Sequence, residues 1–140
     1  PPRSTLFPYT TLFRSMAVWT ILDYVGPKGE CPFFEWQSGL PLDAQAHIDV
    51  RLLQMVGLLK WPEKWISKYK TTEKIYELRI PFKKIQYRPL GVYAPGRKFI
   101  LVEGTVEKGD KIPASALARA RKRQKLLAEE PHHVREHRYN

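Results

Sequence analysis

The sequence predicts an α+β fold in which an antiparallel sheet of about four strands carries two N-terminal helices and a C-terminal helix. Three observations predict it. Four runs are rich in β-branched and aromatic residues, two segments before residue 60 suit helices, and a long alanine- and arginine-rich segment lies near the C-terminus. The last three strand-like runs are joined by short connections, which favour antiparallel neighbours.

The chain opens with a segment that does not look like part of a domain. Residues 5–15 read TLFPYTTLFRS, contain a near-repeat, and resemble the translation of a sequencing adapter. A signal peptide is disfavoured because a continuous apolar run and a small-residue cleavage site are missing, and a natural amphipathic arm is the other alternative. We therefore expect an artefactual or disordered leader at 1–15, one domain at 16–128 and a mobile basic tail at 129–140.

The first half of the domain predicts one strand and two helices. Residues 18–25 form a strand-like run that ends at Gly26-Pro27. A short helix is expected over 32–40, where Gly39 and Pro41 interrupt it. A longer helix is expected over 44–59, with Asp43 as its cap and an apolar stripe that includes Leu59.

The second half predicts three strands and the last helix. Residues 74–82 alternate, so that Tyr76, Leu78, Ile80 and Phe82 form the better core face, while Ile75, Glu77, Arg79 and Pro81 point the other way. In the run 85–93, Pro89 cannot donate to a neighbour and Gly91 has no side chain, which indicates a bulge. The run 98–106 follows, and Pro113 suits the first turn of a helix over 114–128.

Composition limits the classes of function. The net charge is +10, which favours a polyanionic partner, although a merely soluble basic surface is the alternative. The lone Cys31 excludes a disulfide framework and a thiolate zinc cluster, and it suits a reducing cytoplasm. No run approaches the roughly 20 apolar residues of a membrane span, so we expect a cytoplasmic protein without a membrane partner.

An ordered set of short strings carries a family resemblance. These are Tyr76-Glu77-Leu78-Arg79, Gln86-Tyr87-Arg88, Phe99-Ile100-Leu101-Val102, Lys108 with Lys111-Ile112-Pro113, and Ala118-Arg119-Ala120-Arg121. The set resembles RelE/HigB-like toxins of bacterial type II toxin–antitoxin systems, especially their phage-derived branch. The resemblance implies a RelE-like fold, cleavage of mRNA on the ribosome, and restraint by a cognate helix-turn-helix antitoxin. The chain departs from the branch at Glu103, Thr105 and Glu107, where a histidine, an aromatic residue and a lysine are usual.

The implied chemistry needs neither metal nor cofactor. The RNA 2′-hydroxyl attacks the adjacent phosphorus, while the protein removes a proton, stabilises the charged phosphorane and protonates the leaving oxygen. By resemblance, Arg88 is the first candidate for phosphate stabilisation, with Arg79 and Lys108 as helpers. A lysine beside other cations can act as a base, so Lys83 or Lys84 is a candidate, and Glu103 is another because it replaces the histidine.

Each candidate has a structural alternative. Arg79 could form a salt bridge with Glu77, Glu103 could be a surface sheet residue, and Lys83 and Lys84 could form a solvated turn. The expected RNA-binding residues are basic and lie in loops and in the last helix: Lys83, Lys111, Arg119, Lys122 and Arg123.

Two further questions stay open at the level of sequence. The tail histidines His132, His133 and His137 could serve in acid–base chemistry, and the last two have metal-pair spacing, but a flexible tail without metal is the default. The alternative function is a catalytically inactive relative that binds nucleic acid or protein. The nuclease hypothesis rests on Arg79, Arg88 and Lys108 converging as cations over one phosphate. It fails if they lie on separate surfaces or are locked into carboxylate pairs.

Overall fold

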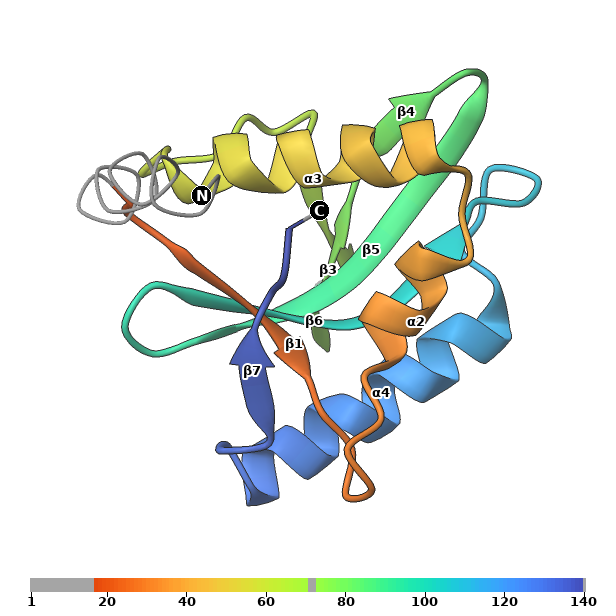
Figure 1. The fold of residues 1–140 in the computed structure, drawn as a ribbon. Coiled ribbons are helices and arrows are strands. Elements are labelled where there is room, and N and C mark those ends of the chain that lie inside the picture. Colours follow the sequence, from red (N-terminus) through yellow and green to blue (C-terminus); the bar gives the residue numbers. More distant parts are fainter. Residues whose placement is uncertain (1–16, 71–72, 140) are drawn as a thin grey trace, which may run out of the picture.

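The computed structural model describes residues 17–70 and 73–139, which form three helices and one mixed sheet (Figure 1). The strand order is β2-β3-β5-β6-β1-β7, and β4 also pairs with β5. In chain order the elements are β1 (Thr20–Tyr24), α2 (Pro32–Ser38), α3 (Leu42–Val56), β2 (Ile66–Lys70), β3 (Glu73–Leu78), β4 (Ile80–Phe82), β5 (Ile85–Ala94), β6 (Lys98–Val106), α4 (Ala114–Glu129) and β7 (Val134–Glu136).

The α+β class is confirmed, but the sheet has seven strands rather than about four. The sequence did not indicate β2 or β7, and the run 74–82 divides at Arg79 into β3 and β4. The sheet is also not wholly antiparallel, because β1 runs parallel to β6 with Ile21 opposite Phe99. Helices α2 and α3 and strands β2–β5 lie between β1 and β6 in the chain, and so long a connection permits a parallel pair.

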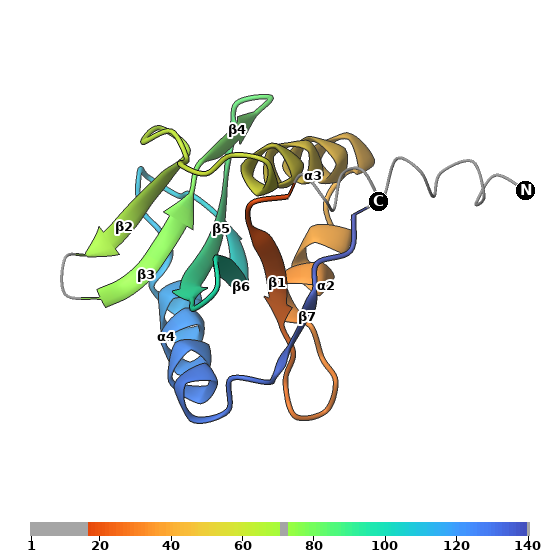
Figure 2. The same cartoon turned by 90° about the vertical axis from the view of Figure 1, so that its left-hand side faces the viewer.

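The helices cover both faces of the sheet (Figures 1 and 2), with α2 and α3 on one side and α4 on the other. The expected alternation in 74–82 is confirmed, because Leu78 and Ile80 join the core that contains Ile48 and Leu52 of α3. Ile75 belongs instead to a second core, which includes residues of α4: Ala116, Leu117, Ala120 and Leu127.

The helix boundaries follow the sequence closely, except at the two ends of α3. Pro41, rather than Asp43, is the N-cap residue, and Asp43 lies in the first turn. The helix ends at Val56, so Leu59 lies beyond it and is 62% exposed instead of buried. Pro113 precedes α4 as expected. In the part of the chain that is described, no helix combines the length and apolarity needed to cross a membrane.

The bulge expected near Pro89 and Gly91 is present between β5 and β6. Leu90 pairs with Glu103 whereas Gly91 pairs with Leu101, so β6 contains one extra residue there. A bulge reverses the alternation of side chains beyond it. At Gly104 the backbone of β6 packs closely against α2, because a Cβ at this position would lie 2.0 Å from the Trp36 ring. The bulge therefore decides which side chains of β6 reach α4.

The C-terminal segment is not a mobile tail. Strand β7 pairs with β1, and the side chain of His137 is fully buried beyond it. Its Nδ1 lies 2.9 and 3.0 Å from the two carboxylate oxygens of Asp23, and its Nε2 lies 3.1 Å from Asp49. The ordered fold thus continues past the expected boundary at 128, whereas the expected leader at 1–15 lies outside the described residues.

Two opposing effects act on His137. Burial by itself lowers the pKa of the imidazole, but the hydrogen bonds and negative charges of Asp23 and Asp49 outweigh it and raise that pKa to about 9. The imidazolium is therefore the stable form in the folded protein near neutral pH. It forms an ionic link between the C-terminal segment, β1 and α3.

Candidate active site

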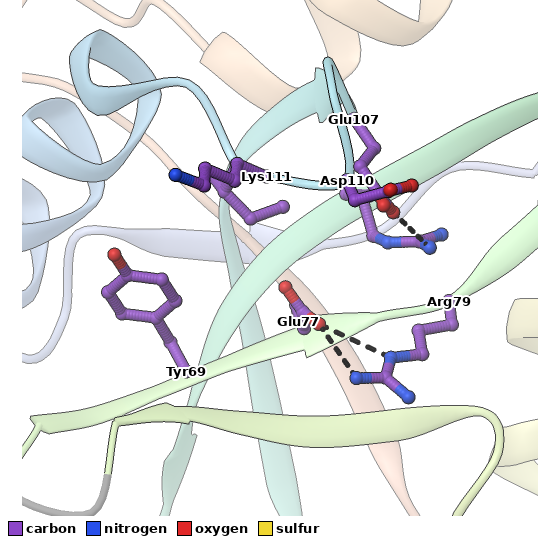
Figure 3. A pocket seen from close by; sticks show the side chains of 8 residues that line it. Tyr69, Glu77, Arg79, Glu107, Asp110 and Lys111 are labelled. Carbon is purple, nitrogen blue, oxygen red and sulfur yellow. Dashed lines mark hydrogen bonds and ion pairs between the residues drawn. The ribbon is translucent and has the colours of Figure 1, made fainter.

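A pocket of about 710 Å³ lies on the face of the sheet that also carries α4. Strands β3 and β5, the end of β2 and the loop before α4 form its walls (Figure 3). Its lining residues are Tyr69, Glu77, Arg79, Arg88, Glu107, Asp110, Lys111 and Ile112. Three of the residues proposed from the sequence therefore lie together, namely Arg79, Arg88 and Lys111.

The two arginines meet because of the strand register. Glu77 pairs with Leu90, and Ile80 pairs with Tyr87, so Arg79 and Arg88 lie at the same level between these pairs. Both side chains reach the same pocket. Two guanidinium groups on neighbouring strands can contact the oxygens of one phosphate, which is the arrangement expected from the sequence.

Arg88 is buried, with only 7% of its surface exposed. One terminal nitrogen donates to the Tyr87 carbonyl oxygen at 3.1 Å, and the other donates to Gln86 Oε1 at 3.3 Å and pairs with Glu107. Its Nε has no hydrogen-bond partner among the described residues. A buried donor without a partner is unfavourable, so an acceptor would gain a hydrogen bond there, but this inaccessible nitrogen is reached only if neighbouring side chains move.

Arg79 forms the salt bridge that was its structural alternative. Its Nε and one terminal nitrogen each lie 3.2 Å from Glu77 Oε1, as Figure 3 shows. The Arg79 side chain is 45% exposed, so it is more accessible than Arg88. Both arginines are therefore paired with carboxylates, so the expectation of free converging cations is wrong, although the two side chains share one pocket.

The charges of the pocket cancel. Its described lining contains three basic residues, which face three acidic residues: Glu77, Glu107 and Asp110. Sequence reasoning noted Glu77 only as a salt-bridge partner and Glu107 only as a departure from the family pattern. The strand that carries Tyr69, β2, was not expected, so no sequence signal placed this residue at the site.

The loop before α4 supplies one lysine to the pocket and directs another elsewhere. Lys108 and Lys111 form an isolated β-bridge, and Gly109 and Asp110 between them have φ values of 55° and 60°. This tight turn places Asp110 and Lys111 in the pocket lining. Lys108 is exposed and is not among the lining residues, so the expected convergence of Lys108 with the two arginines is not seen.

The candidate bases Lys83 and Lys84 lie in the turn between β4 and β5, and neither lines the pocket. Both are exposed, with φ values of 49° and 67°. Lys83 pairs with Asp43 of α3, the helix that covers the opposite face of the sheet. The structure therefore separates these lysines from the arginines, as the solvated-turn alternative requires.

Glu103 is neither a base in the pocket nor a surface residue. It is 5% exposed, pairs with Arg119, lies 3.5 Å from Arg123, and accepts a hydrogen bond from the Gly104 amide. The bulge in β6 turns it toward α4, where it anchors the helix. Two of the expected RNA-binding residues, Arg119 and Arg123, are thereby engaged in structure, whereas Lys122 is exposed on α4.

The tail histidines are divided between two places. His137 is buried between Asp23 and Asp49, so the metal pair suggested by its spacing from His133 does not form. His132 and His133 lie instead beside Glu130 in the turn after α4. None of the three lines the pocket in the described chain.

The comparisons with known proteins support the phage-derived part of the resemblance. A family described as phage-derived protein Gp49-like (DUF891) matches residues 35–125, which is more than half of the chain. The matched region contains the pocket arginines, the loop before α4 and most of α4 itself. No curated protein matches the chain.

Proposed function

Because the chain belongs to the Gp49-like family of phage-derived proteins, a family associated with the toxins of toxin–antitoxin systems, we propose that it is such a toxin and cuts mRNA. The proposed reaction is attack of the RNA 2′-hydroxyl on the adjacent phosphorus, with the substrate presented on the ribosome. The proposed partners are mRNA and a cognate helix-turn-helix antitoxin. The observation that carries the proposal is the presence of Arg79 and Arg88 at one level in a single open pocket.

The arginines would stabilise the phosphorane. Negative charge builds up on the non-bridging oxygens during attack, and planar guanidinium groups donate to such oxygens in pairs. The Arg88 guanidinium is held by the Gln86 side chain and by the Tyr87 carbonyl oxygen, so its position does not depend on substrate. Its Nε is the donor that has no partner among the described residues.

Glu107 would act as the general base. The sequence suggested Glu103 for this role, but Glu103 is fixed to α4 and does not line the pocket. Glu107 lines the pocket and contacts the guanidinium of Arg88, so a base and a phosphate ligand are adjacent. General-base catalysis requires such a group within hydrogen-bond reach of the attacking hydroxyl.

Lys111 and Tyr69 would protonate the leaving oxygen or hold it. In Figure 3 the end groups of both side chains lie to the left of the Glu107 carboxylate, which would act as the base. An in-line displacement places the attacking and leaving oxygens on opposite sides of the phosphorus, so the acid and the base belong on different sides of the site. An ammonium or phenol group can supply the proton.

One specific observation favours a second candidate function, that of a catalytically inactive relative that binds nucleic acid or protein. The formal charges that line the pocket cancel, and each arginine already has a carboxylate partner. A phosphate that enters must compete with those carboxylates for the same donors. If it cannot displace them, exposed residues such as Lys122 would provide binding without cleavage.

The experiment that tests the proposal is induction of the chain in bacteria, with mapping of RNA ends on translated messages. We expect growth arrest and codon-phased cuts, and both should be lost in Arg88→Lys, which keeps the charge but removes the planar fork. Arg138→Ala removes an exposed arginine outside the pocket and should behave like the parent chain.

Normal growth and intact messages in the presence of folded parent protein would exclude the nuclease. Salt-sensitive RNA binding by that same protein would then support the second candidate function.

A further inference from the structure

Three potential metal ligands gather at the C-terminal end of α4, outside the candidate active site and outside the residues that match the family. They are Glu130, His132 and His133, and each offers one ligand atom within 4.8 Å of the other two. His133 Nε2 lies 2.7 Å from Glu130 Oε2, and the two imidazole rings are 4.5 Å apart. No role in the proposed RNA chemistry requires this cluster.

We propose that Glu130, His132 and His133 bind one divalent transition-metal ion, of which Zn²⁺ is the best match. Two imidazole nitrogens and a carboxylate oxygen form a borderline donor set that suits Zn²⁺ and its neighbours better than Mg²⁺ or Ca²⁺. Three protein ligands leave a fourth tetrahedral position for water. The buried Cys31 and His137 are not needed for this coordination.

The geometry requires only small movements. Zinc bonds of roughly 2.0–2.2 Å place tetrahedral ligand atoms about 3.4 Å apart. Because the ligand atoms all lie within 4.8 Å of one another, no pair must close by more than about 1.4 Å, and the 2.7 Å His133–Glu130 pair must open by about 0.7 Å. The side chain of Glu130 is 58% exposed and that of His133 is 26% exposed, and His132 is exposed as well. Exposed side chains can change rotamer without disturbing a core, and their ligand atoms are open to ions from solvent.

The electrostatic setting favours a cation. The carbonyl groups at the C-terminal end of a helix carry partial negative charge, and Glu130 is the C-cap residue of α4. The last turn of α4, which is fully described, contains no basic residue that could neutralise these carbonyls. Glu129 adds a second carboxylate beside the cluster. A metal ion would therefore supply positive charge beside the last turn of α4, which has no basic residue.

The position of the cluster gives the ion a structural consequence. The His133 carbonyl oxygen accepts a hydrogen bond from the Val25 amide at 2.9 Å, and the next residue, Val134, begins β7 opposite Tyr24. An ion shared by Glu130 and His133 would tie the end of α4 to the start of β7. Because the three ligands come together only in the folded chain, binding would stabilise the fold by mass action.

The test uses the full chain without a histidine tag. Zn²⁺ would be titrated by calorimetry at about pH 7.5, Co²⁺ would be followed by its visible absorption, and thermal unfolding would be recorded with and without Zn²⁺. We expect one saturable site, a tetrahedral Co²⁺ spectrum and a higher unfolding temperature with Zn²⁺.

Three variants and one control separate this site from adventitious binding. His132→Ala, His133→Ala and Glu130→Gln should each weaken Zn²⁺ binding by about tenfold or more and remove the thermal shift. The matched control is His47→Ala. In the parent the His47 ring stacks on Phe82 and is not one of the proposed ligands, so this variant should bind Zn²⁺ like the parent. His132→Ala removes an exposed side chain, so loss of binding in that variant cannot be ascribed to unfolding.

The inference is overturned if the parent shows no saturable site, or if the His132→Ala and His133→Ala variants bind Zn²⁺ as tightly as the parent. Loss of the site in His47→Ala would overturn it equally, because the ligands would then lie elsewhere. RNA cleavage is not among the readouts, so the result is independent of the proposed nuclease function.

Discussion

Raising the pH from about 6 to about 9.5 should destabilise the protein through His137. The fold raises the pKa of this imidazole from 6.5 to about 9 through Asp23 and Asp49, despite the opposing effect of burial. Each pKa unit corresponds to about 1.4 kcal/mol, so the link contributes on the order of 3 kcal/mol. Because the folded pKa is the higher one, this contribution is complete below about pH 6.5 and is lost as the pH rises through about 9.

Urea unfolding followed by tryptophan fluorescence provides the assay. Slopes for small domains are about 1–3 kcal/mol per molar, so the loss of roughly 3 kcal/mol should lower the urea midpoint by about 1–3 M between the two pH values. The control is His137→Asn, which keeps a polar side chain but cannot titrate. Its free energy of unfolding should be lower than that of the parent at about pH 6, and the difference between the two free energies should become smaller as the pH rises.

The same pH dependence in the parent and in His137→Asn would refute this reasoning, since other groups would then account for the change. A parent protein that becomes more stable with rising pH would refute it as well. Either result would mean that the imidazole does not hold its proton between the two carboxylates, and that hydrogen bonding of β7 to β1 suffices to hold the C-terminal segment.

Three further predictions concern single residues. Gly104→Ala should lower the free energy of unfolding by about 1–3 kcal/mol, because its Cβ would overlap the Trp36 ring; in Gly57→Ala the nearest atom lies 3.7 Å away, so urea unfolding should detect little change. Glu103→Gln should lower the free energy of unfolding by about 1–3 kcal/mol, because it weakens the ion pair that holds α4. This value is reduced because the Arg119 side chain is partly exposed to solvent, and RNA cleavage per folded molecule should stay near the parent rate. Glu107→Gln should lower single-turnover cleavage by about a hundredfold or more, and an unchanged rate would remove Glu107 as the base.

Local patterns in the sequence predicted much of the fold. The alternation in 74–82 placed Leu78 and Ile80 on the core face and Ile75 on the opposite face, because side chains of a strand alternate whatever the strand pairs with. That the opposite face also carries a core was not predicted. Pro113 and the alanine-rich segment located α4, and Pro89 with Gly91 located the bulge. Each of these features depends on a few neighbouring residues, so it can be recognised without the rest of the fold.

Features that depend on distant partners could not be predicted. Strand β7 is short, and His137 looks like a tail residue until Asp23 and Asp49 are placed around it. The direction of Glu103 was wrong for a related reason, since one extra residue in β6 turns it toward Arg119. The position of Arg79 beside Arg88 depends only on neighbouring strands joined by a short turn. The sequence was sufficient to predict that both side chains lie in one place.

The distribution of charge separates attraction of a polyanion from chemistry on it. The chain carries a net charge of +10, yet the basic and acidic residues lining the described pocket are equal in number, so the surplus lies elsewhere. Exposed Lys122 and Lys125 of α4 and exposed Lys108 beside the pocket are part of that surplus, whereas Arg119 and Arg123 are engaged with Glu103. Long-range attraction depends on net charge, but stabilisation of a transition state depends on a few donors held in place. A neutral pocket beside a basic helix therefore fits the proposed nuclease if RNA binding and catalysis depend on different residues. For the same reason, a relative that lost catalysis would still bind RNA.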